Sequence, residues 1–229
     1  MINHIDVSSV LRRTVCDLYS NLVTRPTGAA VRTEIEQQLA GSRGRTLTVI
    51  DFSNVNLLDF SCADEIVAKL LLRHGAREPL ADAGTAAQGA DRECRESYFI
   101  FRGLHEAHLD AIEAVLERHG LALVAEAADG GRPHLVGIVD DSERAAWETL
   151  SRLGAAALDE LASATGRPRD DAAALLEALC RRRVVMRLDE VYVALGPAVE
   201  GDARVRRARA GGAEGDSGAG DAPGAGRTS

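Results

Sequence analysis

The feature that most constrains the fold is residues 46–52, TLTVIDF, with the helical pattern ADEIVAKLLLRHG following at residues 63–75. The first segment is apolar and β-branched through its centre, as in a strand that is covered on both faces. In the second segment, apolar residues recur three and four positions apart, which predicts an amphipathic helix. A doubly covered strand followed by a helix predicts a layered α/β domain.

Similar patterns extend this organisation along the chain. Helices are predicted in residues 8–23, 24–41 and 105–120, and strands in residues 98–104, 121–127 and 134–140. Strands that alternate with helices favour one α/β domain over residues 1–140. Residues 76–97 and 201–229 are rich in Ala, Gly and charged residues. These two segments are predicted to be a mobile loop within the first domain and a disordered tail.

Residues 141–200 predict a second module. Helical patterns at 141–154, 155–166 and 167–183 precede two short apolar runs around the turn Leu188-Asp-Glu. Three helices followed by a β-hairpin are typical of a winged helix-turn-helix. Asp141 or Ser142 is the predicted N-cap of the first of these helices.

Composition excludes several classes of protein. A formal charge of −8 and an aromatic content of 3% argue against non-specific nucleic-acid binding. Four cysteines without a CxxC pair argue against a zinc site or a disulfide framework. His105 and His108 lack the spacing and third ligand of a zinc site, so no metal or cofactor is expected. Without a membrane-spanning run or signal-peptide core, a cytoplasmic protein without a membrane partner is expected.

Residues 48–66, TVIDFSNVNLLDFSCADEI, resemble the core of STAS-type domains, the fold of anti-sigma factor antagonists. With TRPTGAAVR at residues 24–32, the chain looks closer to a STAS-like family of bacterial proteins of unknown function. The resemblance covers roughly residues 20–125. It implies a non-catalytic regulatory protein that binds a protein partner, such as a kinase or an anti-sigma-like regulator, and that is switched by phosphorylation at Ser61. Phe60 and Cys62 depart from the Ser and Gly of the family pattern.

Ser61 is therefore the candidate switch. A phosphate at a helix start would meet backbone N–H groups, which favour anions. Ser61 with an acidic residue three positions later also fits a simple helix N-cap, so both interpretations remain open. In residues 24–32, two arginines could hold an anion at a helix start. The candidates for the partner surface are Asp59, Cys62, Asp64, Arg25 and Arg32.

Two further functions stay open. Arg167, Arg169 and Arg187 could contact DNA in a transcriptional regulator whose α/β domain is a sensor, although two neighbouring aspartates would repel phosphates. The C-terminal module could instead serve protein or homodimer packing. A small-molecule binder or enzyme could use the region of Asp51, Asp59 and Arg32, but the sequence offers no convergent nucleophile, base and orienting group.

Overall fold

The computed structural model describes residues 2–15, 20–41, 44–75, 96–127 and 131–196. Its central element is a five-stranded sheet with the order β1-β3-β5-β6-β7. The first four strands are parallel, and the last is antiparallel to its neighbour. The strands are β1 (Ile2–Asp6), β3 (Arg45–Asp51), β5 (Glu96–Arg102), β6 (Ala122–Glu126) and β7 (His134–Gly137). The predicted α/β class is confirmed.

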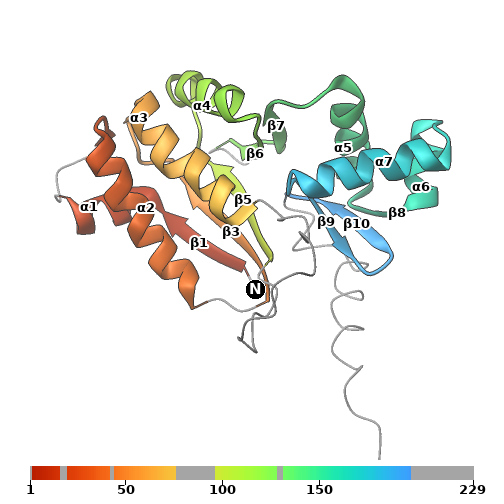
Figure 1. Cartoon of the computed structure of the whole chain (residues 1–229), viewed down its shortest axis with the longest axis horizontal. Coiled ribbons are helices and arrows are strands. Elements are labelled where there is room, and N and C mark those ends of the chain that lie inside the picture. The colour runs from red at the N-terminus through yellow and green to blue at the C-terminus, as the bar shows by residue number, and fades with distance from the viewer. Residues whose placement is uncertain (1, 16–19, 42–43, 76–95, 128–130, 197–229) are drawn as a thin grey trace, which may run out of the picture.

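Helices cover one face of this sheet (Figure 1). Alternate residues of the strands, including Ile50, Phe101 and Leu123, pack beneath them in one apolar cluster. Such alternation follows from the two-residue period of side chains in a strand. The helices are α1 (Val7–Thr14), α2 (Arg25–Ala40), α3 (Phe60–Ala63) with the π-helical segments η1 (Asp64–Ala68) and η2 (Leu71–Gly75) after it, and α4 (Glu106–His119).

The C-terminal module covers the opposite face. Val49, Ile100 and Val124 belong to a second apolar cluster, which they share with Trp147 and Leu179 of the module. The module consists of α5 (Asp141–Leu153), β8 (Ala155–Ala157), α6 (Leu158–Thr165), α7 (Arg169–Arg181), β9 (Val185–Leu188) and β10 (Val191–Ala194). Its sheet has the order β8-β10-β9. Because the second cluster spans both parts of the chain, the module and the sheet have a common core.

A polar contact adds to this interface. Arg183, which is only 9% exposed, donates from Nη1 to the Tyr98 hydroxyl at 3.2 Å. Its guanidinium also lies 5.1 Å from the centroid of the Tyr98 ring. A cation over an aromatic face is attracted by the ring quadrupole, and burial strengthens this attraction. Arg183 therefore joins the segment before β9 to β5.

The structure corrects the N-terminal prediction. Residues 2–6 form a strand that was not predicted, and the helix expected over residues 8–23 ends at Thr14. Ile2 packs against the second apolar cluster and Ile5 lies in the first. The two isoleucines are three residues apart and face opposite sides of the sheet. The segment therefore lacks the alternation of apolar and polar residues that would predict a strand with one buried face.

Other predicted boundaries also change. Most of the predicted loop and the whole predicted tail lie outside the described residues, but Glu96 and Ser97 belong to β5 and not to a loop. Ala155–Ala157 form β8 rather than helix, because they pair with β10. The N-cap of α5 is Asp140, whose carboxylate accepts from the Glu143 amide at 2.7 Å, and not Asp141 or Ser142.

Candidate functional site

The helix that was expected to start at Ser61 starts earlier. Asp59 is its N-cap, since Asp59 Oδ1 accepts from the Cys62 amide at 2.9 Å. The prediction that Ser61 caps the helix is wrong, because Asp59 has extended backbone and a carboxylate that reaches the third helical residue. Ser61 lies half-buried in the first turn, and its hydroxyl donates to the same Asp59 oxygen at 2.8 Å.

Cys62 is a buried structural thiol. Its Sγ donates to the Thr24 carbonyl at 3.0 Å. Burial, and then the nearby Asp59 carboxylate, raise the pKa of Cys62 to about 11. A Cβ atom on Gly28 of α2 would lie 3.0 Å from the Cys62 Cα, so the two helices are in close contact here. Cys62 is therefore a protonated packing residue and, contrary to prediction, is not part of a partner surface.

Two adjacent carboxylates are buried one turn further along. Asp64 is 7% exposed and Glu65 is 3% exposed. Arg25 Nη1 donates to Asp64 Oδ2 at 2.9 Å and to Glu65 Oε1 at 2.8 Å. His119 of α4 donates from Nε2 to Asp64 Oδ1 at 2.9 Å, and Lys69 pairs with Glu65. The carboxylates thus connect α2, η1 and α4, and Asp64 is not a surface residue as predicted.

The ionised forms of both carboxylates are stabilised. Burial alone would raise the pKa of Asp64, but hydrogen bonds from His119 and Arg25 lower it. Burial acts in the same direction on Glu65, and hydrogen bonds from Lys69 and Arg25 lower the pKa of Glu65. Neither carboxylate is therefore poised to exchange protons near neutral pH.

The pairing continues along α2. Arg32 Nε lies 3.5 Å from Glu65 Oε2, and Arg32 Nη1 donates to Glu36 Oε2 at 2.9 Å. Arg73 donates to both oxygens of Glu36 at 3.1 Å. We call this group the ion network, made up of Arg25, Arg32, Glu36, Asp64, Glu65, Lys69, Arg73 and His119. The two arginines predicted to hold an anion are thus occupied by the protein's own carboxylates.

Charged residues also line the carboxyl ends of the parallel strands. Asp6, Asp51, Arg102 and Glu126 occupy one register across β1, β3, β5 and β6. Asp51 accepts from the Ser53 amide at 2.8 Å, and Arg102 donates to the buried Glu126 at 2.8 and 3.0 Å. The Asp51 carboxylate thus stabilises the turn that follows β3, and the Asp59 carboxylate caps α3. Among the described residues, no hydrogen bond joins these two side chains.

His105 and His108 lie against each other at the start of α4. Their ring centroids are 3.5 Å apart. His108 is fully buried, and neither of its ring nitrogens has a hydrogen-bond partner among the described residues. Burial, and then the neighbouring His105, lower the pKa of His108 to about 4. In the described part of the chain, no three metal-ligating side chains gather here or elsewhere.

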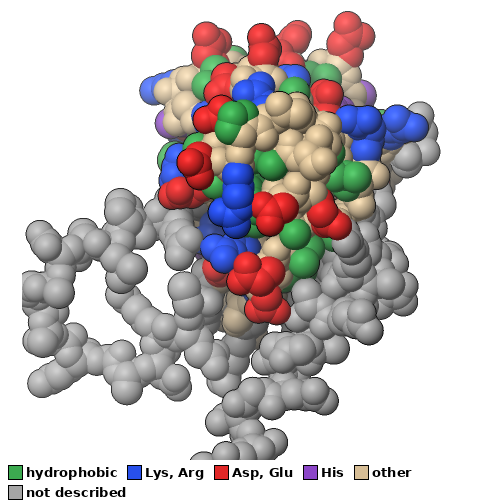
Figure 2. Space-filling model, turned by 90° about the vertical axis from the view of Figure 1, so that its right-hand side faces the viewer, with side chains coloured by type: hydrophobic (Ala, Val, Ile, Leu, Met, Phe, Trp, Pro, Cys, Tyr) green, Lys and Arg blue, Asp and Glu red, His purple; other side chains and the backbone are tan. Residues whose placement is uncertain are grey.

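The arginines predicted to contact DNA each have a partner within the protein. Arg167 donates to the Ser142 hydroxyl at 3.0 Å, and Arg169 pairs with Asp159 at 2.7 Å. Arg187 lies over the Tyr192 ring, with its guanidinium 5.6 Å from the ring centroid. Figure 2 shows the molecule from the right-hand side of Figure 1, with acidic side chains among the basic ones. The described residues therefore form no continuous basic surface on the face that this view shows. DNA contact by these arginines stays a prediction.

Exposed apolar residues gather around the start of α3. Leu57 is 43% exposed, Phe60 is 38% exposed and Val23 is 39% exposed. The short parallel pair β2 (Asn21–Leu22) and β4 (Leu57–Leu58) brings these segments together, and the Asp59 amide donates to the Leu22 carbonyl at 2.8 Å. We call Val23, Leu57, Asp59, Phe60 and Ser61 the α3 start surface.

Sequence reasoning missed the apolar part of this surface. Val23 is the last residue of the helix predicted over residues 8–23, whereas in the structure it follows β2 directly. The pattern of residues 48–66 gives no indication that Leu57 is exposed. Phe60 was noted only as a departure from the family pattern, and its position before Ser61 was the one available signal.

Comparisons with protein-family models, with curated proteins and with solved structures found no match to this chain. None of the helices in the described residues is both long enough and apolar enough to cross a membrane. The assignment of function therefore depends on the chemistry of the surfaces described above.

The ion network should contribute measurably to stability. Glu65→Ala would leave Arg32, whose side chain is only 12% exposed, without its second carboxylate, so we expect a loss of about 2–4 kcal/mol in the free energy of unfolding. Glu177→Ala is the matched control, because its i,i+4 pair with Arg181 is exposed on both sides. That control should cost less than about 0.5 kcal/mol in urea denaturation. Equal losses in the two variants would contradict a structural role for the network.

His108 should make stability depend on pH in a defined window. Its folded pKa, about 4, lies below the ordinary value of 6.5, so the folded state binds fewer protons between these values. Stability from His108 is complete above pH 6.5 and falls as the pH drops towards 4, by at most about 3 kcal/mol.

The variant His108→Phe should lose this dependence and should be at least as stable at pH 7, since it removes an unpartnered buried polar ring. The exposed His134→Gln is the control. The free energy of unfolding of wild type and of both variants is measured by denaturant titration at several pH values. Parallel curves of this free energy against pH for wild type and His108→Phe would contradict the prediction.

Proposed function

We propose that this chain is a non-catalytic regulatory protein that binds a protein partner through the α3 start surface. The observation that carries the proposal is the group of exposed apolar residues beside a half-buried hydroxyl, with Phe60 directly before Ser61. Grouped apolar side chains rimmed by polar ones mark interaction sites on proteins. The STAS-like resemblance of residues 48–66 supports the same assignment.

The chemistry of the neighbouring groups favours binding over catalysis. The Cys62 thiol is held protonated at neutral pH by burial and by Asp59. Asp64 and Glu65 are paired with cations, and Asp51 and Asp59 accept hydrogen bonds from their own turns. None of these described groups forms the nucleophile and base pair that covalent catalysis needs.

Ser61 is the proposed point of control. Its hydroxyl donates to the Asp59 carboxylate that caps α3. Phosphorylation would remove this donor and would place a dianion beside Asp59, with Asp64 one helical turn away. The backbone N–H groups of the helix start would offset only part of this repulsion. The first turn of α3, which carries Phe60, would therefore change its position or order.

We infer that the C-terminal module is winged-helix-like and serves mainly as a packing element. Its order of elements, helix-strand-helix-helix-strand-strand, supports this. Its apolar side is buried against the sheet, and Arg183 contacts Tyr98 of β5. The charged face in Figure 2 mixes acidic and basic side chains, which gives weak attraction for a phosphate backbone.

Removing the exposed ring at the α3 start should weaken partner binding without unfolding the protein. Truncating a central aromatic at an interface costs about 2 kcal/mol or more, which is roughly a 30-fold loss of affinity for Phe60→Ala. Leu153→Ala is the matched control, because Leu153 is 45% exposed at the far end of α5. Quantitative mass spectrometry compares the proteins that immobilised wild type and each variant retain from a lysate. The dissociation constant of the retained partner, once purified, is then measured by titration against wild type and each variant. Equal retention by wild type and Phe60→Ala would sink the proposal.

Control at Ser61 has its own test. Ser61→Ala removes one hydrogen bond to Asp59 and should cost about 1 kcal/mol of stability with little change in affinity. Ser61→Asp, or phosphate added at Ser61, should change partner affinity about tenfold or more, because charge repulsion acts on the turn that carries Phe60. Phosphate on Ser61 should be detectable in protein isolated from its host. If Ser61→Asp binds the partner as wild type does, control at this residue is refuted even where binding at Phe60 stands.

A further inference from the structure

A cavity of about 660 Å³ lies where α5, the end of β10 and the segment before β7 meet. Sites for small molecules typically have volumes of roughly 300–1,000 Å³. The residues that line this cavity all belong to the continuous described stretch 131–196. None of them belongs to the α3 start surface, so the cavity is separate from the site proposed for a protein partner.

Part of the lining is apolar and fixed by packing. Trp147 and Ala194 are almost fully buried and belong to the second apolar cluster. The Trp147 indole also donates to the Val184 carbonyl at 3.1 Å. A Cβ atom on Gly196 would lie 3.0 Å from Pro133 Cγ, so two sides of the cavity are in close contact there. The apolar lining is therefore an extension of the core and is already formed without a ligand.

Three charged side chains, Arg132, Glu148 and Arg152, also line the cavity, and all three are exposed. Among the described residues, Arg132 and Glu148 have no hydrogen-bond or ion-pair partner. Glu148 and Arg152 lie four residues apart on α5, a spacing that often gives an ion pair. Arg152 donates to the Thr149 hydroxyl at 3.1 Å instead. The cavity thus offers two cations and one anion to a ligand.

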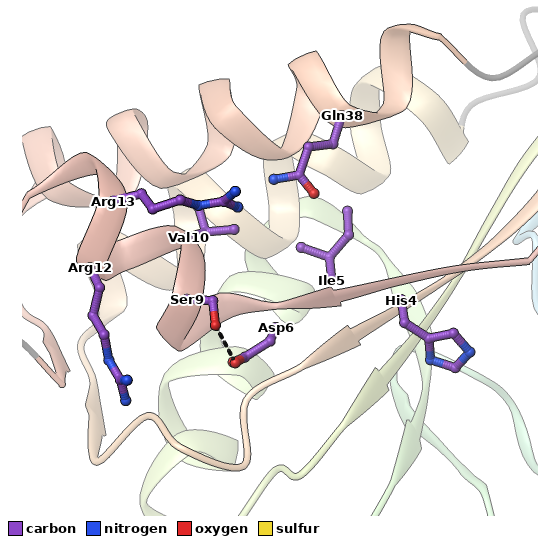
Figure 3. A pocket seen from close by; sticks show the side chains of 8 residues that line it. All are labelled: His4, Ile5, Asp6, Ser9, Val10, Arg12, Arg13 and Gln38. Carbon is purple, nitrogen blue, oxygen red and sulfur yellow. Dashed lines mark hydrogen bonds between the residues drawn. The ribbon is translucent and has the colours of Figure 1, made fainter. Parts of the chain in front are cut away.

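A second cavity, of about 490 Å³, differs in its charges. It lies beside β1, between α1 and α2 (Figure 3). Its carboxylate is that of Asp6, which already accepts from the Ser9 hydroxyl at 2.6 Å. Its two arginines are offset by Asp6 and by Glu34, which lies 3.9 Å from Arg13. The cavity beside α5 is therefore the better candidate for a ligand that carries charges of both signs.

We propose that the cavity beside α5 binds an α-amino acid with a large apolar side chain. The carboxylate of this ligand would pair with Arg132 and Arg152, and its ammonium would pair with Glu148. Its side chain would lie against Trp147 and Pro133. A simple anion would leave Glu148 unpaired beside it, and a simple cation would meet two guanidiniums. An α-amino acid carries both charges on one carbon, next to its side chain, and so complements all three groups.

Trp147 reports on this cavity alone, because it is the single tryptophan of the chain. L-Phenylalanine, added to the full chain, should change the Trp147 fluorescence saturably and should shift the NMR signal of its indole N–H. Hydrocinnamate lacks the ammonium and phenethylamine lacks the carboxylate, so each should bind about tenfold more weakly. No saturable change at millimolar L-phenylalanine, or equal affinity for the three compounds, would overturn the proposal.

Two variants assign the charges, and both replace exposed side chains, so both should fold. Arg152→Gln should weaken the binding of L-phenylalanine and hydrocinnamate about tenfold and leave phenethylamine unaffected. Glu148→Gln should weaken L-phenylalanine and phenethylamine and leave hydrocinnamate unaffected. A loss of the same size for all three compounds in either variant would refute the assigned pairing.

Arg181→Gln is the matched control, because Arg181 is an exposed arginine of α7 that does not line the cavity. It should bind all three compounds as wild type does. Phe60→Ala should also leave their binding unchanged, since Phe60 belongs to the α3 start surface. Failure of partner binding and failure of amino-acid binding are thus distinguished, and a loss of L-phenylalanine binding in Arg181→Gln would overturn the cavity as the site.

Discussion

Burial of the central sheet on both faces is the constraint on which the rest of the structure depends. Strands β3 and β5 send apolar side chains alternately to opposite sides, so each side needs a covering layer. Helices α1 to α4 supply one layer, and the C-terminal module supplies the other. The side chain of Trp147 illustrates this dependence, since it is almost fully buried in the cluster that contains Val49 and Ile100, and its Nε1 donates to the Val184 carbonyl. The module is thus part of the core that the sheet requires.

The ion network solves a different problem, which is how α2, η1 and α4 keep fixed orientations. Apolar contacts alone are tolerant of sliding, whereas a buried carboxylate is stable only with its partners in place. Asp64 receives hydrogen bonds from Arg25 and His119, which lie on two different helices. Rotation of α2 or of α4 away from η1 would remove one of these two hydrogen bonds from a buried carboxylate. The network therefore fixes the orientation of the helix that begins at Phe60 relative to α2 and α4.

The sequence predicted regular, strongly patterned elements and missed those decided by distant contacts. The strand at residues 46–52 and the helices at residues 24–41 and 105–120 follow from local periodicity, and the structure contains them. β1 and β8 form by pairing with strands far along the chain, so the local sequence of these two segments does not predict a strand. Asp64 and Glu65 have the composition of an exposed helix start, but residues 25, 32 and 119 enclose them, and no local pattern reveals this. The start of α3 was singled out from the sequence, while its cap and its exposed apolar residues depend on the positions of β2 and β4.

The helix after Asp59 has an unusual distribution of exposed positions. All seven residues from Cys62 to Ala68 are buried, and the segment includes the π-helical turn η1. A helix enclosed on every side has few positions where a substitution is neutral, because each change creates a cavity, a clash or an unpaired group. Positions that tolerate substitution are thus concentrated at Leu57 of β4 and at Phe60 and Ser61 in the first turn of the helix. A protein built in this way can acquire a new partner by changing a few residues at one turn, while the enclosed helix body behind them stays constant.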